Sequence, residues 1–496
     1  MNGVPNVRAC DYEPAEGDRI STENAWPSPR WDILGAFDLL LPRGLDTLHG
    51  FRRPAFAAPI YQRVVRRLAG YGRLPDPPTV PPPGTGERLQ ADVLVIGGGR
   101  TGRAAAARLV GEGLGTVVLD RAANSVAVDG AEWRAGTTVS FLPRPVAGRS
   151  YPFVAIATRR DRSSVVVRTK EVVVALGGYD GPLLFRGNDR PGVLTAEGAD
   201  AVVPPAGQPP FRRALVFGGG PRVLPLLDRY GQHIEAVAAP GMVRGEIAEK
   251  AAPLEIPVYP RSLLLGASGR HRVRRAHLRT RGGGGPIDLD VDAIILAHRR
   301  LPNPQLFYQA GAKMEWRREA GAYFPILGAD GATSVPGLFA AGTVGGFVPD
   351  GTAAASGRAA ADAVLGRPWK PADLPPRVAA ETPGELEGYY HELLAGPRGR
   401  GKWVLCPCED VLLHEVEEAS ARGFRGIEVI KRMTAVGTGL CQGRYCLPDA
   451  LLVLSVLESR PPSEVGYITQ RPPFLPARLE SLASLPDEEP PPTEAT

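Results

Sequence analysis

Short apolar runs alternate with glycine-rich turns and alanine-rich stretches along most of the chain. Residues 93–96 form an apolar run, which is followed by a glycine-rich turn at residues 97–102 and then by an alanine-rich stretch. A second apolar run, residues 117–119, ends in an acid, Asp120. The lengths of these runs predict a buried strand, a tight turn, a helix and a second strand. This alternation is typical of an α/β protein with a parallel sheet.

The first glycine turn has the spacing and the context of a dinucleotide-binding site. Gly97 allows the tight turn, Gly99 lets the backbone approach a pyrophosphate, and Gly102 lets the helix pack closely on the strand. The pyrophosphate would bind the N–H groups at the helix N-terminus, and Asp120 is placed to accept hydrogen bonds from the adenosine ribose. The alternative is a glycine-rich turn in an ordinary βαβ unit, but strand, helix and acid together favour the dinucleotide site.

A second unit of the same kind begins at residues 214–217, and its pattern is weaker. Gly218 and Gly220 are present, whereas Val223 stands where a third glycine is expected. The next apolar run, residues 234–238, is not followed by an acid. We predict a second nucleotide-type domain. Whether its site holds NAD, ATP or no ligand stays open.

Later steps from strand to glycine return the chain to the first domain. One apolar run leads to Gly177, and another, residues 335–341, leads to Gly342 and then to an alanine-rich helix at residues 351–365. The N-terminus of that helix would lie against the flavin end of a cofactor. This order favours FAD over NAD in the first site, with Gly177 and Gly342 as further cofactor-binding residues. Additional short strands are expected at residues 137–142, 153–158, 164–168, 172–175 and 291–297.

Four of the five cysteines form a C-x-C pair and a C-x4-C pair near the C-terminus, with two expected helices between the pairs, at residues 411–422 and 426–433. Each pair lies in a loop shaped by glycine or proline, so backbone N–H groups can point at sulfur. Four thiolates can hold a [2Fe–2S] cluster, and the expected ligands are Cys406, Cys408, Cys441 and Cys446.

Zinc and disulfides are the alternatives for this cysteine cluster. The C-x-C spacing is shorter than the usual C-x2–4-C spacing of zinc sites, and disulfides are rare in a reducing compartment. Iron–sulfur is therefore favoured. Cys10 stands alone, and we expect it to be a free thiol.

Composition and charge exclude several classes of function. The net charge of +5 and the pI of about 9.0 come from scattered arginines, without the basic stripe of a nucleic-acid-binding protein. The chain opens without the charged and apolar regions of a signal peptide, and its apolar runs are too short to span a membrane. We expect a soluble, cytoplasmic protein. The sequence identifies no catalytic residue: it lacks a G-x-S-x-G motif, a paired H-x3-H motif and the redox disulfide of a disulfide reductase.

With these motifs assembled, the chain resembles the flavoprotein α subunits of heteromeric amino-acid oxidases and dehydrogenases. That family includes sarcosine oxidase, dye-linked proline dehydrogenase, opine oxidase and hydrogen cyanide synthase. The first glycine turn and residues 187–193 and 335–342 match the flavin half of the family. The four clustered cysteines occupy the ligand positions of a bacterioferritin-associated-ferredoxin-like domain. Residues 24–28 and 471–479 also resemble family segments.

The resemblance implies an α/β flavoprotein with two dinucleotide-binding domains and a small α-helical [2Fe–2S] domain. Its implied function is that of one component of an amine or amino-acid dehydrogenase or oxidase, relaying electrons from flavin to an acceptor. The amine-oxidising site would lie on a flavoprotein β subunit. The family's N-terminal ferredoxin-like domain is missing from this sequence, so a separate small iron–sulfur subunit is a further expected partner. The alternatives are an NAD(P)H-dependent ferredoxin or acceptor reductase, a non-catalytic assembly scaffold, and a zinc-stabilised flavoprotein.

The expected domain order places an inserted domain within the FAD-binding domain. A wrapping segment, with an expected helix at residues 58–68 and a proline-rich linker, comes first. The expected ranges are 1–90 for this segment, 91–205 and 286–370 for the Rossmann-like FAD domain, 206–285 for the nucleotide-type insertion, 371–400 for a linker, 401–462 for the cysteine domain and 463–496 for a tail.

Overall fold

The computed structural model describes residues 16–21, 27–28, 31–33, 84–122, 127–202, 207–281, 285–328, 331–346, 353–367, 385–397, 399 and 401–486. The chain divides into two compact units, residues 1–82 and 83–496. In the first unit, strands β1 (Pro27–Ser28) and β2 (Trp31–Asp32) pair in antiparallel orientation. The helix expected at residues 58–68 lies outside the described residues.

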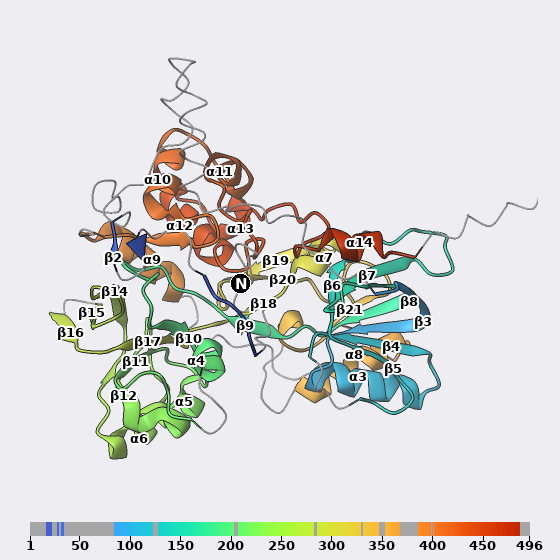
Figure 1. Ribbon diagram of the computed structural model, residues 1–496, viewed down its shortest axis with the longest axis horizontal. Coiled ribbons are helices and arrows are strands. Elements are labelled where there is room, and N and C mark those ends of the chain that lie inside the picture. Colours follow the sequence, from blue (N-terminus) through green and yellow to red (C-terminus); the bar gives the residue numbers. More distant parts are fainter. Residues whose placement is uncertain are drawn as a thin grey trace, which may run out of the picture. The chain divides into compact units, whose positions relative to one another are not determined.

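A seven-stranded sheet organises the first half of the larger unit (Figure 1). Its order is β5-β4-β3-β8-β7-β6, with β21 also paired to β8. Strands β5, β4, β3, β8 and β21 run parallel, whereas β7 is antiparallel to both of its neighbours. The strands are β3 (Glu87–Ile96), β4 (Thr116–Asp120), β5 (Glu132–Ala135), β6 (Thr137–Phe141), β7 (Phe153–Arg159), β8 (Ser164–Val174) and β21 (Leu338–Ala340).

One continuous strand, β8, replaces the two strands expected at residues 164–168 and 172–175. The polar residues between the two apolar runs suggested a break. In the structure, Thr169 is fully buried, and its hydroxyl donates to the backbone carbonyls of Asp92 and Glu171, at 3.1 and 2.9 Å. The strand therefore continues because the buried hydroxyl is satisfied by hydrogen bonds.

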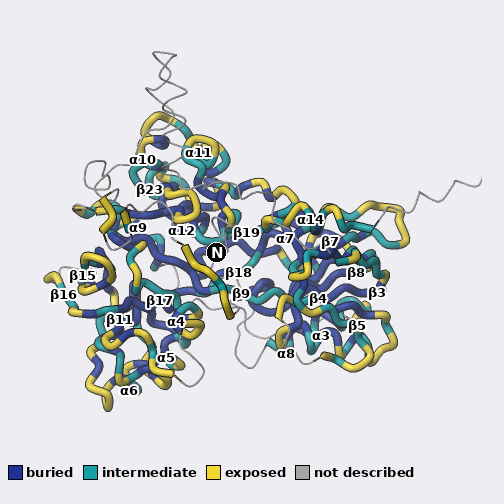
Figure 2. Tube along the Cα trace, in the orientation of Figure 1, coloured by how far each residue is buried: buried dark blue, intermediate teal, exposed yellow. Residues whose placement is uncertain are grey.

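Helices α3 (Arg100–Gly111) and α8 (Ala353–Val364) pack together over one face of this sheet (Figure 1). Their alanines and glycines allow close approach: a Cβ on Gly357 would lie 2.1 Å from the carbonyl oxygen of Thr101. The opposite face packs against the short helix α7 (Gln305–Ala310) and Phe474. Figure 2 shows the central strands of this sheet, β3, β4 and β8, as largely buried.

The second nucleotide-type domain is built on a five-stranded parallel sheet of order β10-β17-β11-β12-β13. Two of these strands, β10 and β17, lie outside the range 206–285 expected for the domain, because an apolar run does not reveal which of two parallel sheets it joins. The elements are β10 (Val193–Thr195), β11 (Ala214–Phe217), β12 (Ile234–Ala238), β13 (Val258–Tyr259), β17 (Ala293–Leu296), helices α4 (Ala196–Val202), α5 (Val223–Tyr230) and α6 (Gly245–Ala251), and the 3-10 helices η1 (Gly231–His233) and η2 (Ala252–Leu254).

The two faces of the second sheet pack against different parts of the chain. Ala214 and Val216 of β11 face helices α4, α5 and α6. Leu215 and Phe217 face a three-stranded antiparallel sheet and the cysteine-containing region, with which they form one continuous core. The smaller sheets are β14 (Ser262–Ser268), β15 (Arg275–Thr280) and β16 (Pro286–Leu289); β9 (Gly178–Asp180) with β18 (Arg300–Pro302); and β19 (Met314–Arg317) with β20 (Ala322–Pro325).

Residues 401–466, hereafter the cysteine module, form a mainly helical bundle (Figure 1). Residues 411–412, expected to begin a helix, instead form a strand, and the helix begins at Leu413, where Glu415 accepts a hydrogen bond from the backbone N–H of Leu412. The elements are β22 (Val404–Cys406), β23 (Val411–Leu412), α10 (Leu413–Ala421), α11 (Ile427–Thr434), α12 (Leu447–Glu458) and α13 (Pro462–Val465).

The segments before and after the cysteine module are also structured. Helix α9 (Glu385–Ala395) lies within the stretch expected to be a linker, and its Tyr389 and Tyr390 are fully buried in the core shared with the module. After the module, the chain returns to the first sheet, where the backbone N–H of Phe474 donates to the carbonyl of Ser140 at 3.1 Å. Helix α14 (Leu479–Ala483) follows. No helix in the described part of the chain is both long and apolar enough to cross a membrane.

Candidate cofactor sites

The first glycine turn is held by backbone contacts that leave no room for larger residues. Gly97 has a φ of +107°, and a Cβ there would lie 2.4 Å from the carbonyl oxygen of Ala175. A Cβ on Gly102 would lie 1.7 Å from the carbonyl oxygen of Gly97. These two glycines therefore bring the ends of β3 and β8 and the start of α3 into direct backbone contact.

A cavity of about 440 Å³ opens beside this turn. The predicted residues Gly97, Gly99, Asp120 and Gly177 line it, together with Arg100 and Thr101 from the first turn of α3. The N-terminal N–H groups of a helix attract anions. The cavity therefore joins an anion-binding helix end to the carboxyl ends of β3, β4 and β8, the edge at which α/β sheets bind ligands.

Asp120 holds the turn as well as facing the cavity. Its carboxylate accepts a hydrogen bond from the backbone N–H of Gly98 and another from that of Ala122, each at 2.6 Å. A carboxylate has about four acceptor positions, so two remain for hydroxyl groups of a ligand.

Gly102 and Gly342 support the cavity without lining it. Gly342 has a φ of +69°, and a Cβ there would lie 2.8 Å from the hydroxyl oxygen of Thr101. Its backbone N–H donates to the hydroxyl of Ser356 in α8, at 3.1 Å. Gly342 thus fixes the end of β21 and the start of α8 against the first helix.

The second glycine turn repeats the backbone geometry of the first. The N–H of Gly218 donates to the carbonyl of Ala238 at 2.7 Å, as the N–H of Gly97 donates to that of Leu119 at 2.8 Å. A Cβ on Gly218 would lie 2.3 Å from a carbonyl oxygen, that of Ala297. The two domains are therefore built alike around their turns.

The side chains that would complete a ligand site differ in the second domain. A Cβ on Gly98 would lie 3.0 Å from the Cβ of Asp120, and a Cβ on Gly219 would lie 3.0 Å from that of Ala239, so Ala239 stands where the first domain has its acid. Gly218 and Gly220, predicted as binding residues, do not line the large cavity.

A buried carboxylate lies beside the start of helix α5 in the second domain. Arg222, which precedes that helix, donates from its Nη2 to both oxygens of Asp180, at 2.8 and 2.7 Å. Asp180 is 5% exposed, and burial raises its pKa, although Arg222 opposes that effect. The arginine nearest this second helix N-terminus is therefore already engaged by an acid.

The four clustered cysteines are free thiols that form two pairs. Cys406 and Cys446 share a hydrogen bond, and Cys408 and Cys441 share another. The pairs are close enough to interact electrostatically, because the charge of Cys406 affects Cys408 and that of Cys441 affects Cys446. All four predicted ligand residues are thus brought together.

Hydrogen bonds make the thiol of Cys406 more acidic than that of Cys446. The Cys446 thiol is the main cause that lowers the pKa of Cys406 to about 6, against the effect of burial, and the same interaction raises the pKa of Cys446. Further lowering comes from backbone N–H groups, those of Gly437, Glu409 and Cys408. Within the described residues, no group of three or more His, Cys, Asp or Glu side chains converges on a single metal-ion position.

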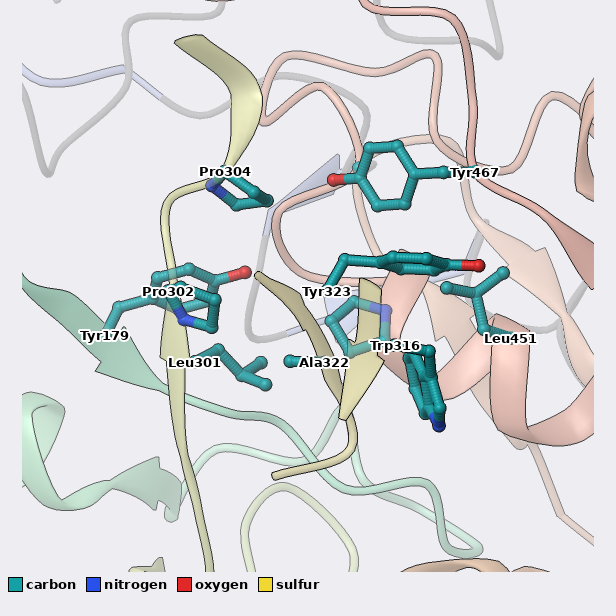
Figure 3. A pocket seen from close by; sticks show the side chains of 11 residues that line it. Tyr179, Leu301, Pro302, Pro304, Trp316, Ala322, Tyr323, Leu451 and Tyr467 are labelled. Atoms are coloured by element: carbon teal, nitrogen blue, oxygen red, sulfur yellow. The ribbon is translucent and has the colours of Figure 1, made fainter. Parts of the chain in front are cut away.

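An aromatic cluster lies next to the cysteine module and includes side chains from β20 and from the segment that follows the module (Figure 3). Tyr308 and Tyr467 stack with ring centroids 4.2 Å apart, and Tyr323 contacts Tyr467 edge-on at 5.5 Å. A small space of about 20 Å³ lies beside Tyr323 and Tyr467, which both line it. Trp316, Tyr179 and Leu451 also line it (Figure 3).

The loop between Cys441 and Cys446 reaches the large cavity. Arg444 lines that cavity, and its backbone carbonyl accepts a 2.6 Å hydrogen bond from the hydroxyl of Tyr179. Its guanidinium lies 5.1 Å from the centre of the Tyr179 ring. Arg444 was not identified from the sequence, and neither were the other cavity residues contributed by distant segments, Asn303, Phe474 and Leu475. The resemblance of the tail segment to family sequences was the only indication for the last two.

Comparison with known proteins agrees with this arrangement. Residues 400–485 match the sarcosine oxidase A3 domain. An opine oxidase subunit of Agrobacterium tumefaciens (strain Ach5) is 26% identical over 368 residues, which are 65% of this chain and 71% of that protein. The alpha subunit of sarcosine oxidase from Rhizobium meliloti (strain 1021) is 28% identical over 96% of this chain, and the chain spans 51% of its length.

Among solved structures, L-proline dehydrogenase from P. horikoshii is similar over 80% of each chain, with a TM-score of 0.59 and 22% sequence identity. This likeness, together with the two repeated glycine turns, shows the predicted α/β fold, with two domains of the dinucleotide-binding type. The similarities in sequence and in fold confirm that the chain resembles the alpha subunits of heteromeric amino-acid oxidases and dehydrogenases.

Proposed function

We propose that this chain belongs to a heteromeric amine or amino-acid dehydrogenase or oxidase, in which it binds FAD and a [2Fe–2S] cluster and relays electrons from the flavin to an acceptor. Its relatives are named as subunits of opine and sarcosine oxidases, which supports the presence of further subunits. The observation that carries the proposal is that the cysteine loop forms part of the cavity beside the first glycine turn. Arg444, which lies between the candidate cluster ligands Cys441 and Cys446, lines that cavity.

FAD fits the large cavity by its chemistry. The start of α3 offers N–H groups to the pyrophosphate, and Asp120 retains acceptor positions for the ribose hydroxyls. The cavity continues from Asp120 past Gly97 to Gly177, across the carboxyl ends of three neighbouring strands.

The spacing of the cysteines supports a binuclear cluster over a single zinc ion, because the C-x-C motif of Cys406 and Cys408 is shorter than the usual C-x2–4-C spacing of zinc sites. A [2Fe–2S] cluster takes four cysteine ligands, which matches the number of thiols in the module. Backbone N–H groups directed at Cys406 would also stabilise negative charge on a ligand sulfur.

The chain's own residues would position the two cofactors relative to each other. Tyr179 holds the cysteine loop at the cavity by its hydrogen bond to the carbonyl of Arg444. Bound flavin accepts an electron pair and passes electrons singly, which is the form that an iron–sulfur cluster takes up. We assign no substrate-oxidising residue to this chain and place that reaction on a partner protein of the complex.

An NAD(P)H-dependent reductase is the second candidate, and two residues of the second domain disfavour it. Ala239 replaces the acid that would bind a ribose, and Val223 replaces the third glycine. We propose that this domain does not deliver hydride, whether it binds NAD, ATP or no ligand.

The test is an anaerobic absorption spectrum of the purified chain, with assays of iron and acid-labile sulfide, before and after NADH and then dithionite. We expect flavin bands, roughly two irons and two sulfides per chain, no bleaching by NADH and reduction by dithionite. Rapid bleaching by NADH would favour the reductase. Zinc in place of iron would overturn the cluster assignment, and a colourless protein would favour an assembly scaffold.

A substitution at Gly99 tests the FAD site without disturbing the backbone. Gly99 lines the cavity, has a φ of −68°, and a Cβ there would meet no atom within 4 Å. We expect Gly99→Val to abolish FAD retention, because the side chain would occupy the place of the pyrophosphate, while the flavin-free forms of the variant and of the unchanged protein unfold within a few degrees of each other.

The matched control for this substitution is Gly111→Val. Gly111 ends the same helix and is exposed, and a Cβ on it would also meet no atom within 4 Å. FAD should remain bound to this variant, as measured by the flavin-to-protein absorbance ratio after gel filtration. If Gly99→Val keeps its flavin, the pyrophosphate does not bind at the start of α3.

A further inference from the structure

We propose that Arg444 is a flavin-binding residue, delivered to the flavin half of the FAD cavity by the loop that also carries Cys441 and Cys446. This inference rests on the proposed function and deepens it by naming a residue of the cysteine module that contacts the flavin directly. Three features support it: the order of strands under the cavity, the surroundings of the guanidinium, and the connection of the loop to the thiols.

Strand order decides which half of the dinucleotide Arg444 meets. Strands β4, β3 and β8 are neighbours, and Asp120, Gly97 and Gly177 stand at or just beyond their carboxyl ends in that order. Asp120 marks the adenosine half and the glycine turn marks the pyrophosphate. The flavin half therefore lies beyond Gly177.

Arg444 lies on that far side. Tyr179, in β9, comes two residues after Gly177, and both its hydroxyl and its ring contact Arg444. Asn303, which also lines the cavity, follows β18, the strand paired with β9. Asn303 and Arg444 therefore line the cavity from segments tied to the β9–β18 pair, which follows Gly177 in the chain.

The guanidinium of Arg444 is available to a ligand. Among the described residues, no carboxylate pairs with it, and its Nε is buried without a hydrogen-bond partner. Burying an unsatisfied donor costs free energy, and a rotation of the side chain toward a ligand acceptor in the cavity would remove that cost. The Tyr179 ring, 5.1 Å away, keeps the guanidinium in place by a cation–π contact.

A cation beside the flavin ring has a definite electrostatic effect. The reduced flavin carries more negative charge than the oxidised form, and charge near the ring tunes its potential. Arg444 should therefore favour flavin reduction as well as flavin binding. Because the same loop holds two candidate cluster ligands, this contact also fixes the flavin relative to the cluster.

The experiment compares Arg444→Gln with the unchanged chain and with Arg432→Gln, an exposed arginine of the same module that does not line the cavity. FAD and ADP affinities are measured by titration of the deflavinated protein, the flavin midpoint potential by dye equilibration, and the cluster by iron assay. We expect Arg444→Gln to weaken FAD binding roughly 10- to 100-fold, to leave ADP binding and iron content unchanged, and to lower the flavin potential.

A second variant, Arg444→Lys, keeps the charge but loses the planar group, so its FAD affinity should fall between those of the other two proteins. Equal FAD affinity and equal potential in Arg444→Gln and the unchanged chain would overturn the inference. An equal loss of ADP and FAD affinity would overturn it too, because Arg444 would then serve the adenosine half. If the unchanged chain binds neither FAD nor ADP, the proposed function itself is wrong.

Discussion

Replacing Asp449 with alanine is expected to lower the free energy of unfolding by about 3–5 kcal/mol, the cost of leaving a buried charge without its partner. Asp449, in the first turn of α12, and Arg299, after β17, are 3% and 4% exposed and form an ion pair. Asp449 also receives a hydrogen bond from Tyr390 of α9. This pair joins the cysteine module to the second domain.

Denaturant unfolding followed by tryptophan fluorescence measures this loss. The matched control is Glu464→Ala, an exposed acid of the same module that pairs with Arg460 at 3.5 Å, and we expect a change of at most about 0.5 kcal/mol. The double substitution Asp449→Leu with Arg299→Met should recover much of the loss, because both charges are then removed. A small effect of Asp449→Ala, similar to that of the control, would contradict a structural role for the pair.

Replacing Cys441 with serine is expected to remove the proposed iron–sulfur cluster, with iron falling from roughly two per chain to near zero. A hydroxyl is a poor ligand for iron compared with a thiolate, and Cys441 belongs to one of the two thiol pairs. Iron and acid-labile sulfide assays measure the loss. Cys10→Ser, at the one cysteine outside the cluster motif, should leave both unchanged. Full iron content in Cys441→Ser would exclude Cys441 as a ligand.

The parts of the fold that could be predicted are those with a local pattern. The first glycine turn was recognisable because strand, glycines, helix and acid lie within a short stretch, and each residue has a distinct steric role. The decay of the second turn was visible for the same reason, since Ala239 and Val223 occupy fixed positions in the same pattern. The cysteine spacing likewise led directly to the four thiols that the structure brings together.

What could not be predicted depends on contacts between distant segments. Nothing in the sequence around Arg444 shows that its loop reaches the cavity, because that contact depends on the shared core of the cysteine module and the second domain. Helix α9 follows a proline-rich stretch that indicated a linker, so the helix and its two buried tyrosines were not predicted. The membership of β10 and β17 in the second sheet depends on strand pairing, which apolar runs do not specify.

The return of the chain to the first sheet has a consequence for biosynthesis. Phe474 and Leu475 line the same cavity as Asp120, although the ribosome makes them much later. The walls contributed by Arg444, Phe474 and Leu475 are therefore missing while the first sheet emerges, and the pocket is complete only after the cysteine module has been synthesised. Tight capture of the proposed FAD would then follow the synthesis of the cysteine module, and shorter nascent chains would lack it.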